Sequence, residues 1–527
     1  MAEQHPDPNA PSESPEIPAQ DLLADRRAKL ERMREEFGID PFGQRTGGLV
    51  SLTEAMNRYD AEADEAHKAD KEDDRRPRVK VAGRVVQHRV LGNLIFMSLR
   101  DETGDLQIAV SKRAVGQSTF KLAKLVDLSD LVVAEGALAK TKTGEITVWA
   151  EKPEDVETGG FALATKSLAL PPGKWHGLQD PELRYRRRYV DLYANPEVMQ
   201  TFQQRSRLIK RVRDFLTDPP EDVAELTGGP FLEVETPMMQ AIAGGAAARP
   251  FVTHHNALDL DLFLRIAPEL YLKRLLVGGM SRVFEINRNF RNEGLSPRHN
   301  PEFTMLELYQ AFGDYETMMA ITERMIQVMA REVIGQEKLP FAEQEIDYSL
   351  PFRRAKYVEL FEEVNGFAAS DHAKLATKAD ELDIDPLDKA HDLLLQEVWE
   401  ETVEKKLIQP TFVMDYPASL CPLTKAKPED PTIAERFELY IAGMEIANAY
   451  TELNDPDAQE ANFRRQVEGL DEEESVFRTV DEDFLQSLRV GMPPAGGLGV
   501  GIDRLVMLLT NSHSIRDVIL FPLMRPR

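Results

Sequence analysis

A single cysteine, Cys421, occurs among the 527 residues of this sequence. One thiol cannot close an internal disulfide, and it cannot supply the several sulfur ligands of a cysteine-based metal site. No apolar run approaches the roughly 18 residues that a membrane-spanning helix needs. The opening MAEQHPDPNA has neither the basic start nor the apolar centre of a secretion signal. We therefore expect a cytoplasmic protein without disulfides.

The common nucleotide-binding motifs are missing as well. There is no G-x-x-x-x-G-K-[ST] loop, no G-x-G-x-x-G that opens a helix after a strand, and no H-E-x-x-H pair. Any ATP site must therefore be built from side chains rather than from a glycine-rich phosphate loop. No repeat of fixed period is present, so a repeat architecture is not expected.

Positive charge is scarce, because 64 Lys and Arg stand against 90 Asp and Glu, which gives a net charge of −26. That total argues against a nucleic-acid partner, since phosphate binding needs cations. The distribution of charge matters more than the sum, however. Basic residues gather in RRPRVK (75–80) and in RYRRRY (184–189), which opens a helix predicted to reach residue 216. Acidic residues gather in DEEESVFRTVDEDF (471–484).

Composition divides the chain into five parts. Residues 1–20 hold five prolines and few large apolar side chains, which predicts a disordered tail. Residues 21–75 show helical spacing of apolar residues and predict a helical extension. Residues 76–158 alternate as four or five short strands, which favours a small closed barrel of the OB-fold type over a β-sandwich or an SH3-like barrel. A linker is expected at 159–180, followed by one α+β domain at 181–527.

A strand–loop–strand pattern contains the densest group of arginines. Between residues 281 and 300, four arginines stand against two glutamates: Arg282, Arg288, Arg291 and Arg298 against Glu285 and Glu293. Such a hairpin can bind a polyphosphate through bidentate arginine contacts, and Phe303 can offer a flat apolar face to a base. A salt-bridged surface hairpin is the alternative interpretation.

Two further segments combine unusual residue types. PAGGLGVG (494–501) precedes an apolar helix that opens with Arg504, and its glycines allow the backbone to approach a ligand. Glu438, Glu445 and Glu452 follow one another at intervals of seven in strand-like sequence. Buried carboxylates in strands need a metal ion or another cation. A solvated strand face explains the same spacing without any ligand.

These segments together resemble a known family. FRNEGLSPRHNPEF is similar to motif 2 of the class II aminoacyl-tRNA synthetases, GGLGVGIDRLVMLL to motif 3, and FLEVETPMM to motif 1. KWHGLQDPELRYRRRYVDL and NAYTELND resemble the bacterial-type class II lysyl-tRNA synthetases in particular. The resemblance runs from about residue 22 to residue 527. It implies an N-terminal OB-fold barrel that binds the anticodon, and a catalytic domain built on an antiparallel β-sheet flanked by helices.

The resemblance also implies a two-step reaction. Lysine and ATP would give lysyl-adenylate and pyrophosphate, and the lysyl group would pass to the 3′-terminal adenosine of tRNA(Lys). The attacking carboxylate is already ionised at neutral pH, so the first step needs alignment and charge neutralisation rather than a general base. The partners implied are ATP, L-lysine, tRNA(Lys), Mg²⁺ and a second copy of the chain, with Pro237 at the dimer interface.

Each motif residue acquires an expected role from the resemblance. The ATP contacts would be Arg291 at the α-phosphate and substrate carboxylate, Arg298 and Arg504 at the γ-phosphate, Phe303 against the adenine, and Glu293 and His299 beside them. The lysine pocket would comprise Glu269, Glu307, Tyr309, Asn448, Tyr450 and Glu452. Mg²⁺ would be held by Glu438 and Glu445. The anticodon would be contacted by Arg89, Phe96 and Gln107.

The residue types of the implied pocket favour lysine over aspartate and asparagine. A buried ammonium needs carboxylate partners such as Glu269 and Glu452, whereas an acidic side chain needs a cation. Ala447 and Ala449 stand where the family has glycine, and Tyr450 stands where it has phenylalanine. Two other functions stay open. One is attachment of lysine-like groups to a protein, against which the barrel argues; the other is RNA binding without catalysis, against which the retained arginines argue.

One segment departs from the family in length. LTDPPEDVAELTGGP (216–230) is longer than the connection that the resemblance predicts before motif 1. Added residues in a loop increase the entropy of loop closure only slowly. We therefore expect a surface loop there.

Overall fold

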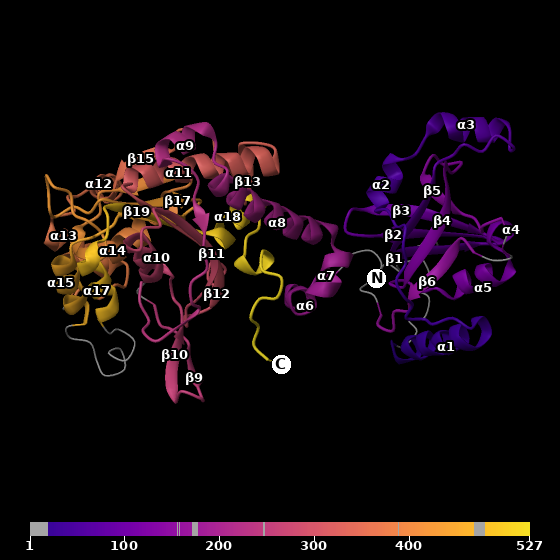
Figure 1. Cartoon of the computed structure of the whole chain (residues 1–527), viewed down its shortest axis with the longest axis horizontal. Coiled ribbons are helices and arrows are strands. Elements are labelled where there is room, and N and C mark those ends of the chain that lie inside the picture. The colour runs from indigo at the N-terminus through magenta and orange to yellow at the C-terminus, as the bar shows by residue number, and fades with distance from the viewer. Residues whose placement is uncertain are drawn as a thin grey trace, which may run out of the picture. The chain divides into compact units, whose positions relative to one another are not determined.

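The computed structural model describes residues 19–154, 156, 159–170, 178–245, 248–387, 389–467 and 480–526. The chain forms two compact units, Met1–Met199 and Gln200–Arg527 (Figure 1). Residues 1–18 of the expected tail, 171–177 of the expected linker and 471–479 of the acidic segment lie outside the described residues. In the described part of the chain, no helix is long and apolar enough to cross a membrane.

Six strands of the first unit form one sheet in the order β1-β2-β3-β5-β4-β6. The strands are β1 (Arg78–Leu91), β2 (Leu94–Arg100), β3 (Asp105–Ser111), β4 (Leu131–Lys140), β5 (Ile146–Ala150) and β6 (Phe161–Thr165). Buried and more exposed residues alternate along β1, where Val79, Val81 and Val85 face the core. β1 also pairs with β4, so the sheet closes on itself. The expected small closed barrel is confirmed.

The expected linker at 159–180 needs a correction. Residues Phe161–Thr165 form β6, which runs antiparallel to β4 and buries Phe161 and Leu163. This strand could not be identified from its sequence, FALAT. It has only five residues, and alanine on every second position gives a weak alternation of apolar and polar side chains. The barrel sheet therefore extends past residue 158.

Three helices precede the barrel strands, and two more lie between β3 and β4. They are α1 (Ala19–Phe37), α2 (Leu52–Asn57), α3 (Ala61–Ala69), α4 (Lys112–Val115) and α5 (Gln117–Leu125). α1 ends before Gly38, whose φ of +62° suits the left-handed residue that follows a helix. The helical extension predicted at 21–75 thus consists of three helices.

The helix predicted from RYRRRY to residue 216 is also divided into three. These are α6 (Pro181–Arg186), α7 (Arg188–Ala194) and α8 (Pro196–Thr217). The first break lies at Arg187, whose φ of −115° and ψ of 48° are not helical. The second lies before Pro196, which has no N–H to continue the preceding helix but suits the first turn of the next. The prediction of one continuous helix is therefore wrong.

The second unit is built on an eight-stranded sheet in the order β15-β16-β17-β18-β19-β12-β11-β7. Its strands are β7 (Leu232–Glu233), β11 (Arg282–Phe290), β12 (Glu302–Ala311), β15 (Arg353–Lys356), β16 (Thr411–Met414), β17 (Arg436–Ile441), β18 (Met444–Thr451) and β19 (Ala495–Gly501). All pairs are antiparallel except β7 with β11 and β15 with β16. The strand β12 therefore lies between β11, which carries Arg282 and Arg288, and the glycine-rich strand β19.

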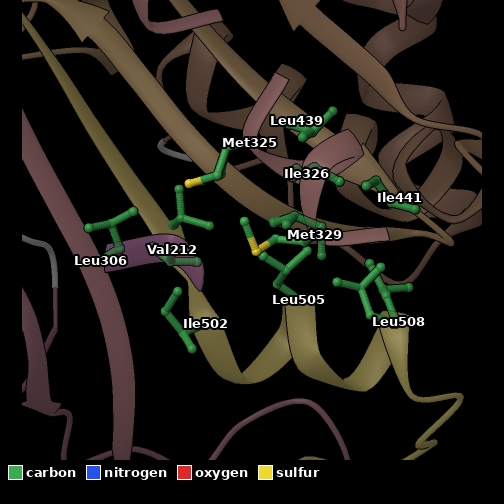
Figure 2. Packing of buried hydrophobic residues seen from close by; sticks show 14 of the residues in the cluster. Val212, Leu306, Met325, Ile326, Met329, Leu439, Ile441, Ile502, Leu505 and Leu508 are labelled. Atoms are coloured by element: carbon green, nitrogen blue, oxygen red, sulfur yellow. The ribbon is translucent and has the colours of Figure 1, made fainter. Parts of the chain in front are cut away.

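Apolar helix faces cover this sheet. The helix α18 (Ile502–Leu509) packs Ile502, Leu505 and Leu508 into a cluster with Met325 of α11 (Tyr315–Val328) and Leu439 of β17 (Figure 2). The cluster is continuous from α8 to α18 and contains the largest group of buried apolar residues that the structure describes. Burial of this kind contributes about 1.5–3 kcal/mol per large side chain, so it fixes α18 and with it Arg504.

The remaining elements lie around the sheet. The strands are β8 (Met239–Gln240), β9 (Val252–His255), β10 (Leu260–Leu264), β13 (Lys338–Phe341) and β14 (Gln344–Asp347). The helices are α9 (Glu221–Thr227), α10 (Glu269–Val277), α12 (Tyr357–Asn365), α13 (His372–Glu381), α14 (His391–Thr402), α15 (Pro456–Val467) and α17 (Glu482–Gly491). α9 corrects the surface loop expected at 216–230, since it buries Val223 and Thr227 against the unit.

Candidate active site

A cavity of about 400 Å³ lies over the central strands of the second unit. Its wall includes all six residues expected at ATP: Arg291, Glu293, Arg298, His299, Phe303 and Arg504. It also includes five of the six expected at lysine: Glu269, Glu307, Tyr309, Asn448 and Tyr450. These residues meet because β12 pairs with both β11 and β19, and β19 pairs with β18.

One end of the cavity is cationic. The guanidinium of Arg291 lies 5.1 Å from the centroid of the Phe303 ring, and its buried Nε has no hydrogen-bond partner in the described chain. Arg298 and Arg504 each donate Nη1 to a backbone carbonyl at the start of β18, over 2.6 and 2.7 Å. These contacts hold two arginines in place before any anion arrives, which favours phosphate binding.

His299 lies among these arginines. Its Nε2 is 3.0 Å from Nη2 of Arg504, and its Nδ1 is 2.8 Å from Oγ of Ser296. Partial burial and the neighbouring Arg504 lower the pKa of His299. The neutral ring can then accept a hydrogen bond from Arg504 and orient it.

Two residues that the sequence did not single out fix the start of α18. Asp503 is buried, accepts a hydrogen bond from the backbone N–H of Thr304 over 2.7 Å, and forms an ion pair of 2.6 Å with Arg205 of α8. The pair joins α18 to β12 directly beside Arg504. The sequence contains only one sign of this ion pair, which is the acidic residue directly before Arg504. A search for apolar periodicity does not take acidic residues into account.

The other end of the cavity is acidic. Glu269, Glu307 and Glu452 are 5%, 4% and 0% exposed, so their carboxylates are not solvated in the usual way. The hydroxyl of Tyr450 donates to Oε1 of Glu269 over 2.8 Å, and the hydroxyl of Tyr309 donates to Oε2 of Glu307 over 3.1 Å. The added hydroxyl of Tyr450 therefore contacts the acidic group rather than open space.

Burial changes the acidity of this end. Burial, followed by the nearby Glu269, raises the pKa of Glu307 to about 8. Burial also raises the pKa of Glu452 to about 8, although Lys273 opposes the shift. Glu452 does not line the main cavity itself, and its Oε1 has no hydrogen-bond partner in the part of the chain that the structure describes. A ligand ammonium would satisfy this oxygen.

Gly497 makes room for these side chains. A methyl group at Gly497 would lie 1.9 Å from Oε1 of Glu452 and 2.6 Å from Cε1 of Tyr309. The glycine is needed because a pocket side chain, and not only a ligand, approaches the backbone of β19 at this point. The sequence predicts that the glycines of this strand let a ligand approach the backbone. At Gly497 the groups that approach it are the side chains of Glu452 and Tyr309.

The two glutamates expected to bind magnesium border a second hollow of about 460 Å³. Glu438 accepts hydrogen bonds from Tyr416 over 2.8 Å and from Tyr440 over 2.5 Å, and it pairs with Arg436. Burial and the charge of Glu438 raise the pKa of Glu445. Both hollows share Glu445, so the acidic group adjoins the cationic end of the cavity.

The donors around this second hollow fit a hard divalent cation in part. Glu400 and Glu404 also line it, and burial together with Glu445 raises the pKa of Glu404 to about 7. Carboxylate oxygens are the ligands that Mg²⁺ prefers. Among the described residues, however, no group of three or more His, Cys, Asp or Glu is placed to hold a metal ion. Oxygen atoms of a ligand would have to complete the coordination.

The residues expected at the anticodon share one face of the barrel. Arg89 on β1 pairs directly with Phe96 on β2, and Gln107 on β3 pairs with Ser98, two residues further along β2. The ring of Phe96 meets Trp149 edge to face at 6.1 Å. Trp149 was not singled out, although the alternation in ITVWA places it on a strand. The face offers partly exposed aromatic rings beside polar groups, which suits unstacked bases.

The basic segments outside the cavity are less free than their charge suggests. In RYRRRY, Arg188 is buried and pairs with Asp191, which also accepts Nε of Arg184 over 2.9 Å. In RRPRVK, Arg75 and Arg76 form ion pairs with the aspartates just before them. Several of the positive charges that gather in these two segments are therefore neutralised locally.

Pro237 lies between β7 and β8 on the surface of the second unit. Its neighbours Met238 and Met239 are exposed, as is Leu232 on β7. Exposed apolar side chains that lie close together are typical of interaction surfaces.

Comparison with known proteins places both units. A family model described as tRNA synthetases class II (D, K and N) matches residues 180–525, and an OB-fold nucleic acid binding domain matches residues 79–156. A lysine–tRNA ligase of Pelotomaculum thermopropionicum is 50% identical over 514 residues, which cover 96% of this chain and 95% of the relative. The chain belongs to the lysine–tRNA ligase family of the class II tRNA synthetases.

Other relatives support the same family. The lysine–tRNA ligase of Carboxydothermus hydrogenoformans is 47% identical, over 96% of this chain and 98% of the relative. That of Staphylococcus aureus is 46% identical, over 96% of this chain and 99% of the relative. The family model by itself covers synthetases for three different amino acids, D, K and N. The lysine–tRNA ligases, in contrast, match this chain along nearly its whole length. The resemblance and the fold class inferred from the motifs are confirmed.

Proposed function

We propose that this chain activates L-lysine with ATP, forming lysyl-adenylate and pyrophosphate, and transfers the lysyl group to the 3′-terminal adenosine of tRNA(Lys). The observation that carries the choice of lysine is the acidic end of the cavity. Three glutamates are buried there, only two of them pair with the internal ammonium of Lys273, and Oε1 of Glu452 has no hydrogen-bond partner in the described chain. A substrate ammonium would satisfy that oxygen, whereas a substrate carboxylate would be repelled.

ATP would occupy the cationic end of the same cavity. Phe303 offers its ring to the adenine, Arg291 offers its unpartnered Nε to the α-phosphate or the substrate carboxylate, and Arg298 and Arg504 meet the γ-phosphate. Glu293 and His299 would lie beside the nucleotide. The acidic and cationic ends would thus hold the two substrates in one hollow, with the lysine carboxylate directed toward Arg291.

The first step of the reaction needs no general base in this arrangement. The carboxylate of lysine is ionised at neutral pH and can attack the α-phosphorus directly. Its approach to a polyphosphate is opposed by like charge, which the fixed arginines offset. Groups that are oriented in advance stabilise the developing charge without reorganising during the reaction. The remaining contribution is alignment of the two reactants.

Magnesium would be held by Glu438 and Glu445 together with oxygen atoms of ATP. The bound ion would supply neutralisation of the phosphate charges. Glu445 is the better placed of the two, because it borders both hollows and lies beside Arg504. Glu438 would have to rearrange its present contacts with Tyr416, Tyr440 and Arg436 to reach an ion.

The barrel would bind the anticodon of tRNA(Lys). Phe96 would stack on a base, and Arg89 and Gln107 would contact base edges, as single-stranded RNA is bound on OB-folds. We further propose a homodimer with Pro237 at its interface. The proposed division of the chain extends the anticodon-binding domain from 76 to the end of β6 at Thr165 and keeps 181–527 as the catalytic domain. An enzyme that uses tRNA and ATP would act in the cytoplasm.

The function is tested by amino-acid-dependent exchange of pyrophosphate into ATP, measured with each of the twenty amino acids. We expect exchange with lysine alone at low substrate concentration. Exchange with aspartate, or with no amino acid, would refute the proposal. Aminoacylation of a tRNA(Lys) transcript then separates a tRNA ligase from an enzyme that lysylates proteins, since only the first charges the transcript.

A further inference from the structure

A lysine side chain already contacts the glutamates at the acidic end of the cavity. Lys273 of α10 is fully buried, and its Nζ is 2.6 Å from Oε1 of Glu269. The same Nζ forms an ion pair with Oε2 of Glu452, which follows β18. It also lies 5.5 Å from the centroid of the Tyr450 ring. One ammonium therefore joins two glutamates that are far apart in sequence and that are both expected to meet the substrate.

The position of this ammonium leaves part of each carboxylate for another ligand. Lys273 and Tyr450 both contact Oε1 of Glu269, and Lys273 contacts only Oε2 of Glu452. Oε1 of Glu452 remains buried without a hydrogen-bond partner in the described chain. Lys273 thus orients both glutamates without saturating them.

The charges at this end can be counted. Glu269, Glu307 and Glu452 contribute three negative charges when ionised, and Lys273 contributes one positive charge. The neighbouring hydroxyls of Tyr309 and Tyr450 contribute none near neutral pH. The excess is therefore two negative charges once all three glutamates are ionised, which the pKa values of about 8 for Glu307 and Glu452 place in the upper part of the neutral range and above it. Lysine carries two ammonium groups, and its single carboxylate is directed toward Arg291 at the other end of the cavity.

We propose that Lys273 is a positioning residue for amino-acid selection, which fixes Glu269 and Glu452 in place and matches the charge of the pocket to the two ammonium groups of lysine. This inference rests on the proposed function, because it takes lysine as the substrate. A simple structural ion pair would need only one carboxylate. Burial would favour the neutral amine, but Glu269 and Glu452 more than offset it and raise the pKa of Lys273, so the internal charge persists across the working pH range.

Charge matching makes an unusual prediction for a pair of substitutions. Glu269→Gln leaves a pocket with an excess of one negative charge, because Lys273 then offsets one of the two remaining glutamates. Adding Lys273→Met to Glu269→Gln restores an excess of two. The double variant should therefore bind lysine better than Glu269→Gln alone, by about tenfold for one unfavourable like-charge contact removed. It also removes both members of a buried pair together, which folds more readily than removal of one.

The experiment measures lysine KM and ATP KM by pyrophosphate exchange for the wild type, Lys273→Met, Glu269→Gln and the double variant, between pH 6.5 and 9. Lysine-dependent exchange by the wild type tests the proposed function by itself. For Lys273→Met we expect a lysine KM raised at least about 30-fold, with ATP KM changed less than about twofold. As pH rises, the lysine KM of this variant should begin to fall at a higher pH than that of the wild type. The reason is that two glutamates have lost their cation and therefore ionise at higher pH.

The outcomes separate the two interpretations of Lys273. A lower lysine KM in the double variant than in Glu269→Gln supports charge matching. A double variant that is equal to Glu269→Gln or weaker overturns it, as does a proportional rise of lysine KM and ATP KM in Lys273→Met with an unchanged pH profile. If Lys273→Met alone does not fold, the comparison of Glu269→Gln with the double variant still decides.

Discussion

Single atoms without partners define the site at the scale of residues. Nε of Arg291, in the cavity wall, and Oε1 of Glu452, which belongs to the buried acidic group beside the other end, are polar atoms with no hydrogen-bond partner in the described chain. Most buried polar atoms in proteins are satisfied, because an unsatisfied one costs about 1–3 kcal/mol. A cation-binding oxygen and an anion-binding nitrogen in one hollow suit a ligand that carries both charges, as an amino acid does.

Replacing Glu452 by glutamine tests the cation-binding oxygen. Loss of a buried charge partner should raise lysine KM about 100-fold, equivalent to roughly 3 kcal/mol, because the substrate ammonium loses its carboxylate. ATP KM should change less than about twofold, since the phosphates lie at the other end. Pyrophosphate exchange at varied lysine and ATP measures both. Glu429→Gln, the same change at an exposed site, should alter neither constant, and an equal loss of both constants in Glu452→Gln would contradict the assignment.

Gly497 can be tested by its smallest substitution. In Gly497→Ala the new methyl would collide with Glu452 and Tyr309, so at least one pocket side chain must move. We expect kcat/KM for lysine to fall about 100-fold and the free energy of unfolding to fall by about 1–3 kcal/mol, as for other overpacked sites. Exchange kinetics and urea unfolding measure the two effects. Gly47→Ala, where a methyl meets open space, should be neutral, and normal lysine use by Gly497→Ala would show that the contact is unimportant.

At the scale of elements, the site depends on how α18 is attached to the sheet. Ile502, Leu505 and Leu508 anchor the helix in the apolar cluster (Figure 2). The ion pair of Asp503 with Arg205 anchors its first turn. Asp503→Asn leaves the Arg205 charge unpaired at a nearly buried position, which should lower the free energy of unfolding by about 3 kcal/mol.

Because Arg504 follows directly, the exchange rate should fall in Asp503→Asn at saturating lysine. Urea unfolding and exchange kinetics check the two expectations. The exposed Asp457→Asn is the matched control. Unchanged stability together with unchanged kcat would show that the ion pair does not position Arg504.

The barrel can be tested separately from the catalytic strands. In Phe96→Ala the loss of one stacking ring should weaken tRNA binding by about 1–3 kcal/mol, which is roughly 5-fold to 150-fold in tRNA KM. Pyrophosphate exchange without tRNA should be unaffected, because the cavity belongs to the second unit. Aminoacylation at varied tRNA(Lys) gives the first value. Phe42→Ala, which removes another exposed ring of the same unit, should leave tRNA KM unchanged. Equal effects of the two substitutions would argue against base stacking at Phe96.

Elements with strong periodicity could be predicted from the sequence, and those with weak periodicity could not. The alternation in β1 and the apolar face of α18 identify a strand and a helix directly. β6 was missed because alanine gives little contrast between the two faces of a strand. α9 was missed because the prolines and acidic residues around it are typical of a loop. The pairing of β12 with β19 joins residues nearly 200 positions apart, which local pattern cannot supply.

The candidate site shows the same division. The family motifs name the residues around the cavity, because each motif is a contiguous segment. Lys273 and Asp503 were not named, since their importance depends on partners from distant segments, Glu452 and Arg205. Local composition gives the types of charge in a site but not the pairing that remains after folding.

At the scale of the whole molecule, two buried glutamates and one half-buried glutamate make stability depend on pH. The pKa values of Glu307 and Glu452 are raised to about 8 and that of Glu404 to about 7, above the ordinary 4.5. A raised folded-state pKa favours the protonated fold, so this stabilisation is complete below pH 4.5 and is lost as pH rises through 7 and 8. Each such proton changes the free energy of unfolding by up to about 1.4 kcal/mol per pH unit.

The melting temperature of the ligand-free protein should therefore fall by several degrees between pH 6 and pH 9. Added lysine should raise it more at pH 8.5 than at pH 6, because the ionised carboxylates bind its ammonium groups. Thermal unfolding with and without lysine measures both trends. Glu452→Gln removes one titrating group and should reduce the fall and the lysine effect together. A lysine effect that is equal at both pH values would contradict the raised pKa values as the basis of lysine binding.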